Sequence, residues 1–385
     1  MHTLKDAPQS LSRAPTPSII LDLGKLQKNC DRMLRRCRDV GARLRPHMKT
    51  LKSAEAAARA RDPSHGGIAV ATLNEAEYFA SHGFTDIQYA VCISPDKLPL
   101  AERITARAPQ FSFFVDSIAV ARELVEFTST RNVTLRAWLE IDCGEHRTGV
   151  SPEGMELIEI ASILSSPNVR LAGVATHAGH SYRARTKAEL CTIAEQETQA
   201  VRKAAQRLIA AGIKVGALSA GSTPTALNFT SASDLTEVRA GVYMAGDLFQ
   251  AAIGSLSQDD IAISVLATVI SHNTRLNQVV IDAGGLALSK DRSTAAVPEF
   301  DVGYGLALDM LGRPLGPKLT VGGVHQEHGE IRSEDPLLLE RLPIGTRVRV
   351  LPNHVCMTAA MYDRYLVVDG SDKIIDTWGR TNGWS

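Results

Sequence analysis

The chain has 385 residues, of which 44% are hydrophobic and 22% are charged, and this composition is typical of a folded globular protein. Lys plus Arg and Asp plus Glu both number 42, so the formal net charge is zero, and charge gives no support for a nucleic-acid or membrane-surface partner. The length is too great for one small domain and fits one large domain plus a second. We therefore expect a small-molecule partner.

The sequence shows no pattern typical of export or membrane insertion. Residues 1–10 (MHTLKDAPQS) contain no apolar signal core, so we expect a cytoplasmic protein. The longest conspicuous uncharged stretch, 215–233, is interrupted by Gly, Ser, Thr and Pro, which excludes a spanning helix. The six cysteines form no CxxC pair, so we expect no disulfide framework.

In chain order, residues 17–23 (PSIILDL) predict a strand and residues 23–39 predict a helix. From there to about residue 240, short apolar runs alternate with longer helical stretches, which is the pattern of βα units in a parallel sheet. The candidate strands are ARLRPH, GIAVA, IQYAV, FSFFV, TLRAWLEID, RLAGVATH, VGALSA and TEVRA. Eight parallel strands with interleaved helices predict an α/β fold, a (β/α)8 TIM barrel.

From about residue 261 the pattern changes to short strands separated by turn signals, without helices. These strands are AISVLATVISH, NQVVIDA, KLTVGG, TRVRVLPNHVCMT, RYLVVDG and KIIDTWG. They predict a C-terminal all-β domain after the barrel. We assign residues 25–250 to the barrel, and residues 251–385 together with an N-terminal strand in residues 1–24 to the β domain.

The loops after the seventh and eighth barrel strands are candidate phosphate-binding segments, because active sites of such barrels lie at the C-terminal ends of the strands. The seventh strand leads into Gly221, Ser222 and Thr223, where backbone N–H groups and hydroxyls suit a phosphate dianion. The eighth leads into Gly241 and Tyr243. The alternative for the first segment is a turn that caps a helix, but its place after strand seven favours phosphate.

The first barrel strand offers a candidate nucleophile. Its alternation sends Arg45, His47 and Lys49 to the barrel interior, with Lys49 nearest the catalytic rim. In a partly desolvated barrel mouth a lysine has a lowered pKa and becomes a Schiff-base nucleophile, whereas most lysines are simply solvated. A phosphate-binding loop opposite a lysine is the pair that pyridoxal 5'-phosphate (PLP) requires, so the two features together favour a PLP enzyme.

Two further loops reach the same rim. The segment DCGEHRTG carries Arg147, and the segment HAGHSY carries His177, His180 and Tyr182. Arg147 and His177 are candidates for contact with a cofactor ring, and His180 and Tyr182 are secondary candidates. The alternatives are that Arg147 pairs with Asp142 to brace the turn and that His177 is a histidine satisfied in the core.

His354 and Cys356 form the candidate metal site. The predicted strand TRVRVLPNHVCMT places them at positions i and i+2, so that both side chains project from the same face. An imidazole with a thiolate is a good zinc pair, and only two protein ligands leave coordination positions open for substrate or water. The alternative is chance juxtaposition, because a His-x-Cys pair is a short motif.

As a set, these motifs resemble the fold type III PLP enzymes, and within them the D-serine dehydratase and D-threonine aldolase group. The resemblance implies an alanine racemase-like barrel followed by a β domain, and a homodimer. The matching segments run in order from about residue 17 to residue 358: PSIILDL, RPHMKTLKS, LEIDCGEHRTGV, THAGHSY, SAGSTPTA, EVRAGVY, VIDAG, QEHG and PNHVCMT.

The resemblance also implies roles for the candidate residues. It implies that Lys49 binds PLP as a Schiff base, that His177 packs against the pyridine ring, and that the segments 221–223 and 241–243 hold the phosphate. It implies that His354 and Cys356 bind a divalent metal beside the substrate. The thiolate favours zinc, with manganese as the alternative.

The metal motif and the phosphate loop bear on the reaction. Bacterial D-threonine and 3-hydroxyaspartate aldolases tend to carry His-x-Asp and Gly-Gly-Gly-Thr-Gly at these places, whereas this chain has His-x-Cys and Ser-Ala-Gly-Ser-Thr. These features resemble the dehydratase branch. They imply a lyase that converts a 3-hydroxy-D-amino acid, D-threo-3-hydroxyaspartate or D-serine, to a 2-oxo acid and ammonia.

In the implied reaction, Lys49 removes the Cα proton and the metal makes the β-hydroxyl a viable leaving group. The main alternative is an aldolase that uses the same cofactor and metal and gives glycine and an aldehyde. That reaction needs a base for the β-hydroxyl, and His180 is available by position. A racemase and a PLP carrier without catalysis are the remaining alternatives.

Overall fold

The computed structural model describes residues 9–384 and divides into two compact units. The barrel unit comprises Asp31–Gly241 together with the described residues from Thr381 onward. The β unit comprises the described part of Met1–Cys30 together with Val242–Arg380. Helix α1 (Leu23–Asp39), which the sequence predicts with the same bounds, contains the first boundary between them.

The barrel unit contains a parallel sheet of eight strands within the described residues, and each strand was predicted from the sequence. The order of the sheet is β2-β9-β8-β7-β6-β5-β4-β3, and a parallel bridge between His47 and Ala69 joins β2 to β3, so that the sheet closes. The predicted TIM barrel is therefore confirmed. The strands are β2 (Arg43–Pro46), β3 (Ile68–Val70), β4 (Ile87–Cys92), β5 (Ser112–Val115), β6 (Leu135–Glu140), β7 (Val169–Ala175), β8 (Leu218–Ala220) and β9 (Glu237–Ala240).

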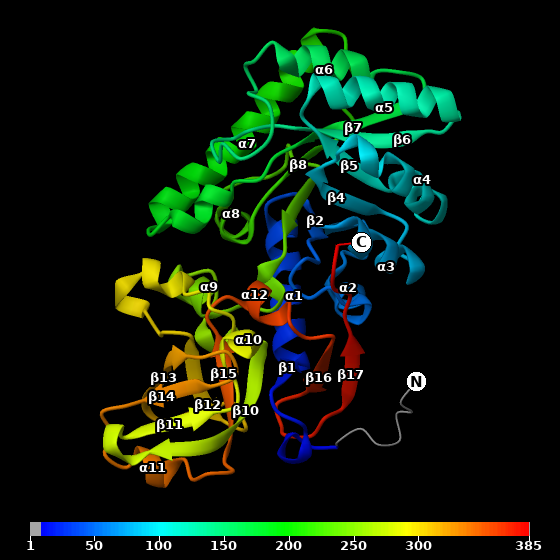
Figure 1. Cartoon of the computed structure of the whole chain (residues 1–385). Coiled ribbons are helices and arrows are strands. Elements are labelled where there is room, and N and C mark those ends of the chain that lie inside the picture. The colour runs from blue at the N-terminus through cyan, green and yellow to red at the C-terminus, as the bar shows by residue number, and fades with distance from the viewer. Residues whose placement is uncertain (1–8, 385) are drawn as a thin grey trace. The chain divides into compact units, whose positions relative to one another are not determined.

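Helices connect successive strands of the barrel, and Figure 1 shows α4–α7 on the outer side of the parallel strands. Their starts carry local signals: Thr72 accepts a hydrogen bond from the Glu75 N–H at the start of α3, and Thr186 and Glu189 form a capping box at the start of α7. The helices are α2 (Ala54–Ala60), α3 (Leu73–Ser81), α4 (Leu98–Arg107), α5 (Ile118–Arg131), α6 (Glu156–Leu164), α7 (Lys187–Ala210) and α8 (Thr223–Asn228).

The β unit is built on a mostly antiparallel sheet with the order β11-β14-β13-β12-β15-β10-β1-β16-β17. Strand β10 pairs with β11 as well as with β15, so six of these strands close on themselves. The N-terminal strand β1 pairs with β10 and with β16, which joins the start of the chain to its C-terminal part. The strands are β1 (Ser18–Asp22), β10 (Ile263–Asn273), β11 (Gln278–Ile281), β12 (Gly305–Asp309), β13 (Pro314–Val324), β14 (Gly329–Arg332), β15 (Arg347–Pro352), β16 (Arg364–Val368) and β17 (Asp376–Gly379).

The β unit also contains short helices, so the expectation of strands without helices is wrong. They are α9 (Leu248–Ala252), α10 (Gly285–Leu288), α11 (Leu338–Arg341) and α12 (Val355–Ala359). Each is one to two turns long, and such turns carry too little periodicity to be read from a sequence. Strands β12 and β14 were also missed. The predicted C-terminal β domain is otherwise confirmed, because this unit is built on the nine-stranded sheet.

Each unit has its own core. In the β unit, Val265, Val279, Ile281, Val321 and Ile331 belong to one buried apolar cluster on the closed part of the sheet.

All six cysteines are free, which confirms that no disulfide is present. A search of the described helices for one that is both long enough and apolar enough to cross a membrane finds none.

Candidate active site

Five barrel strands bring candidate residues to the same end of the sheet, because the C-terminal ends of parallel strands meet at one rim. Lys49 follows β2 and His177 follows β7. Gly221 follows β8 and Gly241 follows β9, while Arg147 lies in the loop after β6. The structure therefore brings the predicted cofactor residues of the barrel unit together.

His177 is held in place by the turn after β8. Its ring Nδ1 lies 2.9 Å from the carbonyl oxygen of Gly221, so Nδ1 carries the proton. Burial, together with the positive charges of Lys49 and Arg239, lowers the pKa of His177 to about 3. His177 is therefore a neutral imidazole with a fixed orientation, which fits both a histidine satisfied in the core and a contact with a cofactor ring.

The rim concentrates positive charge around neutral rings. Burial, followed by Lys49, Arg239 and His177, lowers the pKa of His47 well below its usual range, so this second imidazole is also neutral. The Arg239 guanidinium is buried and fixed: it donates a hydrogen bond of 2.5 Å to the Ser219 hydroxyl and lies over the Phe114 ring. Such a rim favours an anion, for example a phosphate or a carboxylate.

Lys49 lies in a turn directly after β2, and its side chain is exposed. The expected desolvation of this lysine is therefore not observed. The reason is local: the strand ends at Pro46, and the Lys49 N–H lies 3.4 Å from the ring Nδ1 of His47, so the chain turns before the strand alternation reaches residue 49. The amine remains accessible, close enough to influence both imidazoles of the rim.

The turn after β8 combines a close backbone approach with a helix cap. Gly221 has φ +127°, and a Cβ placed there would lie 2.5 Å from the Arg239 carbonyl oxygen, so the position requires glycine. Ser222 caps α8 in a capping box with Thr225, and its hydroxyl also lies 2.9 Å from the Ser181 hydroxyl. The capping interpretation is therefore confirmed for the Ser222 side chain.

The turn after β9 is also closely packed. A Cβ at Gly241 would lie 2.6 Å from the His47 carbonyl oxygen, so this position also requires glycine. Tyr243, which belongs to the β unit, lies in a 3-10 turn (Val242–Met244) and is 1% exposed.

A carboxylate that the sequence analysis missed links two of the rim loops. Glu197 of α7 is fully buried, and its Oε1 accepts hydrogen bonds from the Ala178 N–H at 2.8 Å and the Gly221 N–H at 2.9 Å. Burial raises the pKa of Glu197. The signal was available, because Glu197 is spaced with Leu190, Ala194 and Val201 on the apolar face of its helix.

Arg147 lies beside a cavity rather than in a brace. Asp142 does brace the turn, because its Oδ2 lies 2.7 Å from His146 Nδ1 and its Oδ1 accepts a hydrogen bond from the Gly144 N–H. The side chain that pairs with Asp142 is therefore His146, and not Arg147 as the alternative expected. Arg147 and His177 line one small pocket. The other residues that line this cavity are Glu140, Ile141, Asp142, Cys143, Glu145 and Thr148.

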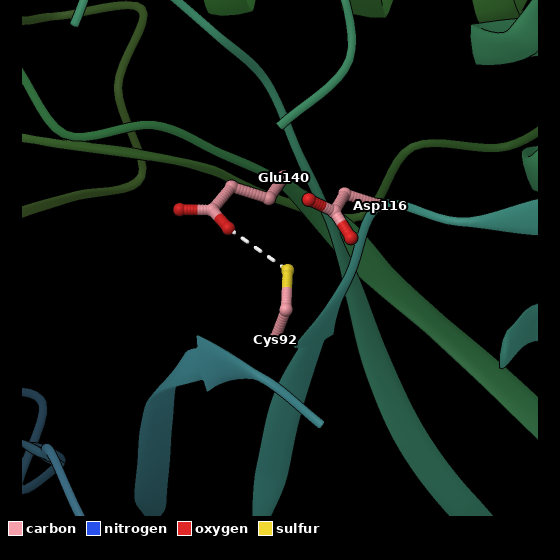
Figure 2. Close-up of side chains that lie close together, drawn as sticks. All are labelled: Cys92, Asp116 and Glu140. Atoms are coloured by element: carbon pink, nitrogen blue, oxygen red, sulfur yellow. Dashed lines mark hydrogen bonds between the residues drawn. The ribbon is translucent and has the colours of Figure 1, made fainter. Parts of the chain in front are cut away.

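Cys92, Asp116 and Glu140 form a polar cluster at the ends of β4, β5 and β6 (Figure 2). The Cys92 thiol donates a hydrogen bond to Glu140 Oε2 at 3.0 Å, and Asp116 accepts one from the Gly149 N–H at 2.9 Å. Burial and the Glu140 charge raise the pKa of Cys92, so the thiol is protonated. The cluster therefore holds the loop that carries Arg147, and sequence spacing gave no sign of it.

The secondary candidates lie in the 3-10 turn Gly179–Arg183. His180 is partly buried, and its Nδ1 lies 3.5 Å from Glu145 Oε2. Tyr182 is partly buried in the same turn. His180 and Glu145 thus form a pair close to the cavity, because Glu145 is one of the residues that line it.

The predicted metal pair lies in the β unit, on a helix start rather than on a strand. Strand β15 ends at Pro352, His354 is the N-cap of α12, and Cys356 lies in the first turn of that helix. The strand expectation is therefore wrong. The two side chains nevertheless face each other, because they form a hydrogen bond.

The surroundings of His354 are acidic. Its Nδ1 lies 2.6 Å from Asp291 Oδ2, and the buried Asp247 accepts a hydrogen bond from the Val355 N–H at 3.0 Å. Burial lowers the pKa of His354, but hydrogen bonds with Asp291 and Cys356 outweigh it and raise the pKa to about 10. A half-buried imidazole and thiol side by side, with carboxylates around them, fit a soft divalent cation such as zinc.

Two family models match the chain. The alanine racemase N-terminal domain matches residues 21–248, and a serine dehydratase domain matches residues 262–368. The chain is 42% identical to D-threo-3-hydroxyaspartate dehydratase from Delftia sp. (strain HT23) over 96% of this chain and 98% of that protein. The solved structure of that dehydratase superposes with a TM-score of 0.94 at 40% identity, covering 98% of this chain and all of the other. A cysteine-to-alanine mutant of it has been solved in the metal-free form.

Two further relatives cover nearly the whole chain. D-serine dehydratase from Schizosaccharomyces pombe is 31% identical over 98% of this chain and 94% of its own length. D-threonine aldolase from Arthrobacter sp. is 28% identical over 96% of this chain and 92% of its own length. The chain therefore belongs to the alanine racemase-like family in which this N-terminal barrel is joined to a serine dehydratase domain.

Proposed function

We propose that the protein is a PLP- and metal-dependent dehydratase that converts a 3-hydroxy-D-amino acid, D-threo-3-hydroxyaspartate or D-serine, to a 2-oxo acid and ammonia. The observation that carries this proposal is the 42% identity, over nearly both full lengths, to a dehydratase of D-threo-3-hydroxyaspartate. The lower identity to D-threonine aldolase supports the same choice. At the rim, the positive charges of Lys49 and Arg239 lie beside the neutral imidazoles of His47 and His177. This arrangement supports a site for an anionic cofactor and an amino acid.

The residues of the barrel rim fit PLP. Lys49 would bind it covalently, and the closely packed turns at Gly221 and Gly241 would face its phosphate. When bound, PLP takes up the electron pair that is left when the Cα–H bond breaks. Lys49, which is accessible, would accept that proton on its amine. His177 stays neutral and fixed by Gly221, so it would pack against a ring without adding charge.

His354 and Cys356 would hold the metal, and we propose zinc, with manganese as the alternative. A divalent metal supplies a Lewis acid that stabilises a leaving hydroxide. With only two protein ligands, coordination positions remain for the β-hydroxyl of the substrate. Loss of the Cα proton and of hydroxide yields an enamine, which tautomerises to an imine, and water then hydrolyses this imine to the 2-oxo acid and ammonia. The metal-free cysteine mutant of the Delftia enzyme supports a metal role for cysteine in this family.

An aldolase is the second candidate, and one observation favours it. The pair of His180 and Glu145 beside the cavity offers a base for the β-hydroxyl, which cleavage of Cα–Cβ requires. The products separate the two reactions, because the dehydratase gives ammonia and a 2-oxo acid whereas the aldolase gives glycine and an aldehyde.

Family resemblance further supports a homodimer, and light scattering of the purified protein tests it.

The test is an assay of both product channels with D-threo-3-hydroxyaspartate, D-serine and D-threonine, with and without a chelator. Ammonia that disappears with the chelator and returns with zinc is the expected result. Glycine and an aldehyde would replace the dehydratase by the aldolase. Inactivity in both channels would contradict both and favour a racemase or a PLP carrier.

A further inference from the structure

The side chain of Asp291, in the loop after α10, contacts the proposed metal ligand His354 directly. We propose that Asp291 is a positioning residue that fixes the His354 imidazole so that its Nε2 faces the metal, and thereby strengthens metal binding. This inference rests on the metal site of the proposed function. Asp291 is not among the residues that the sequence analysis identified.

The contact determines which ring nitrogen is available. Asp291 Oδ2 lies 2.6 Å from His354 Nδ1, and a carboxylate only accepts hydrogen bonds, so Nδ1 must carry a proton. The lone pair of a neutral imidazole is then on Nε2, at the other side of the ring. A carboxylate on the second nitrogen of a ligating histidine fixes both the tautomer and the orientation of the ring. Cys356, the proposed second ligand, forms a hydrogen bond with the same ring.

Asp291 is itself held in place. The Ser293 hydroxyl donates a hydrogen bond of 2.5 Å to Asp291 Oδ1, which leaves Oδ2 for His354. The Asp291 N–H donates to the Ser289 hydroxyl at 3.0 Å. The hydroxyl of Thr358 in α12 donates to the Leu288 carbonyl oxygen in α10 at 2.8 Å. The loop that carries Asp291 is therefore connected to the helix that carries the ligands, and such a connection is what a positioning residue requires.

The second carboxylate near the ligands, Asp247, has a different task. Its two oxygens accept the N–H groups of Gln250 at 2.7 Å and of Val355 at 3.0 Å. Asp247 therefore caps α9 and holds the backbone at the start of α12. Asp291 contacts the ligating side chain itself, so the two carboxylates make distinct predictions.

Zinc affinity of the cofactor-loaded protein tests the inference without relying on turnover. Metal is removed by dialysis against a chelator, and zinc is then titrated in competition with a chromophoric chelator. Asp291→Ala is expected to bind zinc about 10- to 100-fold more weakly than the wild type. The PLP absorbance spectrum should be unchanged. Asp363→Asn is the matched control, because Asp363 is an exposed carboxylate of the same unit, and its affinity should equal that of the wild type.

A double-mutant cycle separates a positioning role from direct ligation. If Asp291 acts through His354, then adding Asp291→Ala to His354→Ala causes no further loss of zinc affinity. A further loss in that background would show that Asp291 binds the metal itself, and would overturn the inference. Ser293→Ala, which removes only the hydroxyl on Asp291 Oδ1, should weaken zinc binding in the same direction by a smaller factor and keeps the inference testable if Asp291→Ala does not fold.

The failures of the inference and of the proposed function are distinguishable. Equal zinc affinity of Asp291→Ala and the wild type would overturn the positioning role alone. A wild-type protein that forms ammonia but binds no zinc, manganese or other divalent cation would overturn the metal role in the proposed function, and the inference with it.

Discussion

Replacing Glu197 by alanine is expected to destabilise the protein and to weaken PLP binding, because this buried carboxylate joins the His177 loop to the proposed phosphate-binding turn at Gly221. The substitution leaves the N–H groups of Ala178 and Gly221 buried without this acceptor. A buried donor without a partner costs about 1–3 kcal/mol, so the free energy of unfolding should fall by about 2–6 kcal/mol. Both loops carry proposed cofactor contacts, so PLP affinity should fall as well.

Conservative and control variants test the reason for this loss. Glu197→Gln keeps a carbonyl oxygen for both N–H groups and should cost less than about 1.5 kcal/mol. Glu195→Ala removes an exposed carboxylate from the same helix and should change stability by no more than about 0.5 kcal/mol. The assay is guanidinium unfolding of each variant, together with titration of the apoprotein with PLP.

The pH dependence adds a signed test. Burial raises the pKa of Glu197, so the folded state binds this proton more tightly than the unfolded state. Stability from this group is present below its ordinary pKa and is lost as pH rises through the folded pKa. Glu197→Gln should therefore gain stability relative to the wild type as pH rises. A loss below about 1 kcal/mol for Glu197→Ala, with unchanged PLP affinity, would refute the reasoning.

Three further predictions concern Lys49, Cys356 and the buried ion pair between Arg45 and Glu237 in the barrel. Lys49→Ala should abolish turnover and covalent attachment of PLP, which the absorbance spectrum and borohydride reduction followed by mass spectrometry check. Cys356→Ala should lose metal, measured by elemental analysis, and turnover, while PLP still binds; an active metal-free variant would contradict the Lewis-acid role. Glu237→Gln should lower the free energy of unfolding by about 3–5 kcal/mol, because it breaks the buried 2.7 Å ion pair with Arg45. Burial alone would raise the pKa of Glu237, but Arg45 and His65 hold it well below its usual range. In the wild type, the stabilisation from this group is therefore present above the ordinary pKa of a glutamate and is lost as pH falls through the folded pKa. Acid unfolding of Glu237→Gln should accordingly depend less steeply on pH.

The barrel was predictable because its strands are short, apolar and regularly separated by helices. Each strand core identified in the sequence is a strand of the sheet, and α1 has the predicted bounds. The β unit was less predictable. Strand β12 (GLALD) contains five residues and strand β14 (GEIR) contains four, and each is too short for its pattern to be recognised in the sequence.

The positions of the candidate residues were predicted better than their local structure. The alternating pattern through His354 and Cys356 was interpreted as a strand, but the strand stops at Pro352 and the buried Asn353 side chain bonds to Thr294 and to the Gly303 carbonyl oxygen instead. These partners lie about 50 residues or more away in sequence, so no local pattern reveals them. The two side chains still meet because i and i+2 are close at a helix start.

The supporting side chains could not be predicted for a similar reason. Glu197 acts on loops that begin about 20 residues before and after it, and Asp291 contacts a histidine 63 residues away. The apolar face of α7 indicates that Glu197 is buried, but a single sequence does not show which groups either carboxylate contacts. The contacts of Glu197 become visible only in the folded barrel, and those of Asp291 only in the folded β unit.

The most direct test of the central claim is the product analysis with D-threo-3-hydroxyaspartate as substrate, comparing the zinc-loaded protein with the chelated protein. Our account predicts a 2-oxo acid and ammonia in equal amounts from the zinc-loaded protein, and neither product after chelation. Glycine with an aldehyde, or ammonia that forms equally well without metal, would contradict it.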